Sequence, residues 1–61
     1  MNRFEMIEKL TKNELIYLQE NPERLDDVVE FFTNGGYAKE SDYELEKLCT
    51  WYGFFPETEN D

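Results

Sequence analysis

Residues 21–33 read NPERLDDVVEFFT, and this stretch decides the fold. Its apolar side chains follow the i, i+3, i+4, i+7 spacing that places them on one face of an α-helix. They are Leu25, Val28, Val29 and Phe32. Pro22 follows Asn21 and suits the first position of a helix, because an N–H group there has no intrahelical partner. The stretch therefore predicts a helix over residues 22–33.

A β-hairpin is the alternative for this part of the chain. Residues 28–32 and 36–38 would pair around Asn34-Gly35, a dipeptide common in two-residue hairpin turns. The helical period is the stronger signal. Asn34, Gly35 and Gly36 also suit the end of a helix, where left-handed backbone is common. We therefore expect the helix.

Three further helices are expected from capping patterns. At each start, a capping residue stands three positions before a glutamate, so that side-chain oxygens can accept first-turn N–H groups. The pairs are Asn2 with Glu5, Thr11 with Glu14, and Ser41 with Glu44. The expected helices cover residues 3–10, 12–20 and 42–52, and the predicted fold is all-α, a compact bundle of three to four short helices. Their apolar stripes, expected in the core, are Phe4, Ile7 and Leu10, then Leu15 and Leu18, and then Leu45, Leu48, Cys49 and Tyr52.

The length of 61 residues suits a single small domain. We expect it over residues 1–55, followed by a flexible acidic C-terminal tail over residues 56–61, because Pro56 blocks helical continuation. Phe54 and Phe55 either fold back on the core or stay exposed as a hydrophobic contact. Disorder is the alternative for so charged a chain, but five Phe, four Tyr and one Trp favour folding.

The charge narrows the classes of function. Fifteen Asp and Glu against six Lys and Arg give a formal net charge of -9. This charge opposes direct binding to nucleic acid or to anionic membranes, and it favours a partner protein with a basic surface. The sequence has no apolar run of about 20 residues and no signal-peptide pattern over residues 1–10. We expect a cytoplasmic protein, in the host cytoplasm if it is phage-encoded.

Catalytic and metal sites lack their usual residues. The chain has no histidine and Cys49 is its single cysteine, which excludes an internal disulfide and a zinc site built from Cys and His. Cys49 falls in an apolar stripe, which favours a buried thiol over an activated nucleophile. Asp26, Asp27 and Glu30 lack the ligand spacing of an EF-hand loop. We expect no catalytic residues, no metal and no cofactor, and a protein that is not an enzyme.

Two acidic clusters are the main candidates for binding. The first cluster has helical spacing on the polar side of residues 22–33, and comprises Glu23, Asp26, Asp27 and Glu30. The second cluster brackets the start of residues 42–52, and comprises Glu40, Asp42, Glu44 and Glu46. The alternative for both clusters is an ordinary solvated surface that keeps a small protein in solution.

Aromatic side chains outside the apolar stripes complete the candidate surface. They are Tyr17, Tyr37, Tyr43 and Trp51, and we expect several of them to be partly exposed. Tyr and Trp are common hot-spot residues of protein interfaces. Tyr43 and Trp51 are therefore included among the candidate binding residues.

In its size, its acidic clusters and its lack of catalytic groups, the chain resembles the small acidic proteins that bacteriophages and mobile elements use to inhibit host factors, including DNA mimics. Carboxylates one helical turn apart are about 5–6 Å from each other at Cβ, which is comparable with the spacing of phosphates along DNA. We expect an inhibitor or regulator that docks a carboxylate-rich helix face on a basic surface of a host or partner protein, such as a nucleic-acid-binding surface. The alternative is an assembly module that forms a homodimer, or pairs with another helical subunit, through an apolar stripe.

Overall fold

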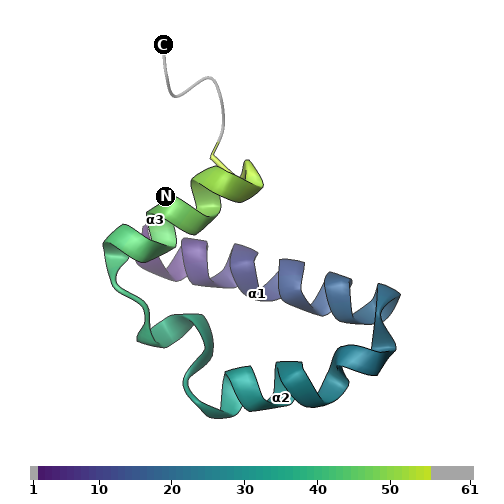
Figure 1. The fold of residues 1–61 in the computed structure, drawn as a ribbon. Helices are drawn as coiled ribbons and strands as arrows, with labels where there is room; N and C mark the ends of the chain where they lie inside the picture. The colour runs from purple at the N-terminus through teal and green to yellow at the C-terminus, as the bar shows by residue number, and fades with distance from the viewer. Residues whose placement is uncertain (1, 56–61) are drawn as a thin grey trace.

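The computed structural model describes residues 2–55, and every regular element in that range is helical. The elements follow in the order α1 (Arg3–Glu20), η1 (Pro22–Arg24), α2 (Leu25–Thr33), η2 (Gly36–Lys39) and α3 (Asp42–Tyr52), where η marks a 3-10 turn. The long helix α1 lies between α2 and α3 (Figure 1). The predicted all-α bundle is confirmed. The expected tail over residues 56–61 falls outside the described residues.

Helix α1 is continuous where the sequence predicted two helices. It begins with a complete capping box, in which the Asn2 side chain accepts from the Glu5 N–H at 2.8 Å and Glu5 Oε1 accepts from the Asn2 N–H at 3.1 Å. Thr11 lies inside α1, and the predicted helix start at this residue was wrong. No proline or glycine occurs between Arg3 and Glu20, so nothing in the backbone interrupts the ladder of hydrogen bonds.

Helix α2 begins at Leu25 rather than at Pro22, because residues 22–24 form the tighter turn η1. The chain leaves α2 through Gly35 at φ 111° and Gly36 at φ 55°, both in left-handed backbone. A Cβ on Gly36 would lie 2.7 Å from Phe32 Cδ1, so this turn requires glycine. Residues 28–32 are helical and residues 36–38 belong to η2, so the alternative hairpin does not form.

Helix α3 matches the prediction over residues 42–52. Ser41 Oγ accepts a hydrogen bond from the Glu44 N–H at 3.2 Å, and Gly53 closes the helix at φ 76°. Arg3 connects this start to α1, because one guanidinium nitrogen lies 2.7 Å from Asp42 Oδ1 and the other donates to the Ala38 carbonyl at 2.7 Å. The N-terminus of α1 is thereby joined to the beginning of α3.

The hydrophobic core is built from α1, η2 and α3. Its buried members are Met6, Leu10, Tyr37, Leu45 and Cys49. Tyr37 was expected among the partly exposed aromatics, but its side chain is 8% exposed. Its ring meets the edge of the Phe31 ring at a centroid distance of 4.9 Å. Phe54 and Phe55 pack against this core, which decides between the two alternatives for them.

Several residues of the predicted apolar stripes lie at the surface instead of in the core. They are Phe4, Leu15, Leu25, Val29 and Tyr52, each at least 42% exposed. A bundle this small covers only part of each helix. On α2, Val28 is buried, whereas Leu25 and Val29 on the same stripe are half-exposed. This limited coverage follows from the high surface-to-volume ratio of a short chain.

Candidate functional site

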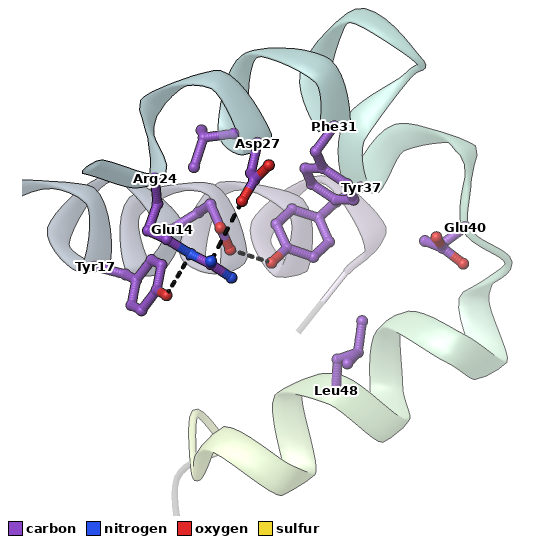
Figure 2. Close-up of a pocket in the computed structure, with 9 residues that line it drawn as sticks. Glu14, Tyr17, Arg24, Asp27, Phe31, Tyr37, Glu40 and Leu48 are labelled. Carbon is purple, nitrogen blue, oxygen red and sulfur yellow. Dashed lines mark hydrogen bonds and ion pairs between the residues drawn. The ribbon is translucent and has the colours of Figure 1, made fainter. Parts of the chain in front are cut away.

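A groove of about 350 Å³ runs between α2 and α3, with α1 beneath it (Figure 2). Its polar lining comprises Glu14, Tyr17, Arg24, Asp27, Tyr37 and Glu40. Its apolar lining comprises Val28, Phe31 and Leu48. We call this hollow the acidic groove, because it carries three carboxylates against one guanidinium.

Tyr37 and Glu14 join the groove to the core. The Tyr37 hydroxyl, carried on η2, donates to Glu14 Oε1 on α1 at 3.0 Å (Figure 2). Burial, followed by the hydrogen bond to the carboxylate, raises the pKa of Tyr37 well above its ordinary value. The hydroxyl therefore remains a donor at neutral pH and holds Glu14 in place on the groove floor.

Arg24 occupies one end of the acidic groove. Its Nε donates to the Tyr17 hydroxyl at 3.1 Å, and its terminal nitrogen lies 3.4 Å from Asp27 Oδ2. Figure 2 shows Arg24 and Tyr17 at the end of the groove opposite Glu40. These contacts hold the positive charge of Arg24 at one end of the acidic groove.

The first acidic cluster is divided by the start of α2. Successive residues of an α-helix are about 100° apart around the axis, which places Asp26 and Glu30 on the outer side of α2. Asp27 lies farther around the helix axis than Asp26 and Glu30, on the side of α2 that lines the groove. Glu23 is exposed in η1, before α2 begins, so the four carboxylates do not share one α-helical face.

The second acidic cluster is also distributed over different surroundings. Glu40 lines the acidic groove, whereas Asp42 is paired with Arg3. Glu44 lies 3.9 Å from Lys47 Nζ on the same helix. Glu46 lies on the outer side of α3, where it borders a separate hollow together with Lys47.

The groove therefore brings together one carboxylate from each predicted cluster, Asp27 and Glu40. It adds Glu14, which sequence reasoning missed because this glutamate was assigned to a capping box with Thr11. No sequence signal marks Glu14 as a groove residue, since its neighbours there lie on α2, η2 and α3. Only the packing of the helices reveals it.

The two predicted aromatic binding residues lie away from the acidic groove. Tyr43 and Trp51 are 68% and 77% exposed on the outer side of α3. Together with Glu46, Lys47 and Thr50 they border a second, shallow hollow of about 510 Å³. The Lys47 ammonium lies 5.5 Å from the centroid of the Tyr43 ring.

The described part of the chain was compared with the requirements of a metal site and of a membrane-spanning helix. Over residues 2–55, no group of three or more His, Cys, Asp or Glu side chains is placed to hold a metal ion. Within the same range, no helix has both the length and the apolar character needed to cross a bilayer.

Cys49 is fully buried, and burial raises the pKa of its thiol.

Comparison with known proteins found no matching family model, no matching curated protein and no matching solved structure. The chemistry of the site is therefore the basis for assigning a function.

Proposed function

We propose that this protein is a small acidic inhibitor or regulator that binds the basic surface of a partner protein. The observation that carries the proposal is the convergence of Glu14, Asp27 and Glu40 on one groove from three separate parts of the fold. Carboxylates that only keep a protein in solution do not have to face a common groove. A concave acidic surface instead complements a protruding basic one.

The side of α2 that faces away from the groove carries exposed apolar area of its own. Leu25 and Val29 are 52% and 53% exposed, and they lie beside Asp26 and Glu30 around the helix axis. Protein interfaces combine apolar contacts at the centre with a polar rim. The outer side of α2 supplies both, on the part of the helix that faces away from Asp27 and the groove, and this supports a protein partner.

Electrostatics selects the kind of partner. A formal net charge of -9 steers basic proteins toward this one and repels acidic ones. We propose a nucleic-acid-binding surface as the target, because such surfaces present Lys and Arg side chains to a row of phosphates. The helical carboxylates of α2 would then occupy the place of phosphates.

The test uses the partner purified after capture from a bacterial lysate, with affinity measured by isothermal titration calorimetry. The variant Asp27→Lys with Glu30→Lys reverses two neighbouring charges on α2, one of which lines the acidic groove. The matched control, Glu8→Lys with Glu20→Lys, makes the same change in net charge on α1. We expect the α2 variant to lose binding and the control to retain most of it, with both variants folded by circular dichroism.

Equal affinities for the α2 variant and the control would reject the proposed surface. Binding that does not weaken with added salt would reject the electrostatic basis, because exposed charges are screened at high ionic strength.

Self-association is the second candidate function, and the exposed aromatics on α3 favour it. Tyr43 and Trp51 leave apolar area open on a side that also carries Glu46 and Lys47, so it is less acidic than the groove. Sedimentation velocity over a range of protein concentrations distinguishes the candidates. A dimer that Trp51→Ala dissociates would support self-association, and a monomer at all concentrations would remove it.

A further inference from the structure

The acidic groove combines aromatic rings with carboxylates, which is the chemistry that holds a guanidinium group. Arginine is planar, stacks on aromatic faces and donates paired hydrogen bonds to carboxylates. Phe31 and Tyr37 supply rings to the groove, and Glu14 and Glu40 supply carboxylates. The volume of about 350 Å³ lies at the lower end of the usual range for ligand pockets, roughly 300–1,000 Å³. It suits one long side chain.

Two cationic side chains of the protein already contact carboxylate or aromatic residues that line the groove. Arg24 contacts the Tyr17 hydroxyl and the Asp27 carboxylate. The Lys39 ammonium lies 5.6 Å from the centroid of the Phe31 ring. Both kinds of contact that a bound guanidinium would make are therefore present at the edges of the groove.

Two carboxylates remain for an incoming cation. Within residues 2–55, neither Glu14 nor Glu40 takes part in an ion pair. Figure 2 places Glu14 on the floor and Glu40 at the end away from Arg24, with Leu48 across the groove. A cation entering there meets negative charge without displacing Arg24.

We infer that the acidic groove receives an arginine side chain of the partner protein, between Glu14 and Glu40. The inference rests on the proposed function and names the group that the site recognises. Arginine fits better than lysine, because a guanidinium is more weakly hydrated than an ammonium and stacks on aromatic rings. An arginine inserted into a pocket is also a common hot spot of protein interfaces.

The test is an NMR titration of the isotope-labelled protein with the acetylated, amidated tripeptide Gly-Arg-Gly. The matched probe contains citrulline, which has nearly the shape of arginine without its charge. We expect the arginine peptide to shift the amide signals of Glu14, Tyr37, Glu40 and Leu48, with saturation at millimolar concentrations. The citrulline peptide should bind about tenfold more weakly, because charge-assisted hydrogen bonds are lost.

Two protein variants locate the site. Glu14→Gln keeps an oxygen that accepts from Tyr37 but removes the charge, and it should weaken the arginine peptide about tenfold. Glu8→Gln removes the same charge at an exposed position of α1 and should leave the affinity unchanged. Matching amide spectra outside the mutated positions verify that both variants keep the fold.

Four results would overturn the inference: no saturable binding, equal binding of the citrulline peptide, equal binding of the corresponding lysine peptide, or shifts confined to the outer side of α2. If the partner protein still depends on Asp27 and Glu30 while the arginine peptide does not bind the groove, this inference fails and the proposed function stands. If binding of the partner protein is also independent of Asp27 and Glu30, both fail.

Discussion

The Tyr37 hydroxyl donates a hydrogen bond of 3.0 Å to Glu14 Oε1, which joins the turn η2 to the middle of α1. The Tyr37 ring belongs to the hydrophobic core, and Glu14 forms part of the floor of the acidic groove. The pair therefore couples the stability of the fold to the geometry of the candidate site.

Tyr37→Phe should lower the free energy of unfolding by about 1 kcal/mol, the usual net contribution of one hydrogen bond. The ring is kept, so the edge-on contacts with Phe31 and Phe32 remain. Urea unfolding followed by circular dichroism measures the difference. A variant as stable as the wild type would show that this hydrogen bond contributes nothing in solution.

Alkaline pH should destabilise the wild-type protein more than Tyr37→Phe. Burial and the Glu14 carboxylate raise the pKa of Tyr37 in the folded protein, so above the ordinary tyrosine pKa of about 10 the folded state binds more protons than the unfolded state. The stabilisation is complete below that pH. It falls above it by up to about 1.4 kcal/mol per pH unit.

Urea unfolding of both proteins from about pH 9 to pH 11 tests this dependence across the ordinary tyrosine pKa. The raised pKa of Cys49 affects both proteins alike, so the difference between them reports Tyr37. Parallel losses of stability would contradict the assignment.

The two glycines at helix ends should differ in their tolerance of alanine. Gly53→Ala should cost about 1–2 kcal/mol, because φ is 76° but a Cβ there meets no atom within 4 Å. Gly36→Ala meets Phe32 Cδ1 at 2.7 Å as well as a positive φ, so a further 1–3 kcal/mol or so is expected. Thermal and urea unfolding measure both variants, and equal losses would show that the turn has room to adjust.

Helix caps and the end of α3 could be predicted from the sequence because they depend on local chemistry. Asn2, Ser41 and Gly53 all act at the expected positions. Thr11 misled the prediction, because a threonine three residues before a glutamate also occurs inside helices. The capping pattern alone does not distinguish a helix start from a helix interior.

Packing could be predicted only in part. Leu10, Leu45 and Cys49 are buried as their helical spacing indicated. Tyr37 could not be placed in the core, because a 3-10 turn of four residues has no period to read. The acidic groove needs α1, α2, η2 and α3 in their relative positions, so Glu14 could not be grouped with Asp27 and Glu40 before the fold was known.

Cys49 should resist alkylation in the native protein. Its side chain is fully buried and burial raises the pKa of the thiol, so the reactive thiolate is both scarce and covered. Mass spectrometry should show slow modification by iodoacetamide in buffer and rapid modification in urea. Equally rapid modification under both conditions would place Cys49 outside a stable core.

The most direct test of the central claim compares two pairs of neutralised carboxylates against the purified partner protein. Glu14→Gln with Glu40→Gln removes two charges from the acidic groove, and Glu8→Gln with Glu20→Gln removes two from exposed positions of α1. Both variants change the net charge from -9 to -7. Calorimetric titration should show a loss of at least about tenfold in affinity for the groove variant and little change for the control. Equal affinities for the two variants would contradict the claim that this groove binds the partner.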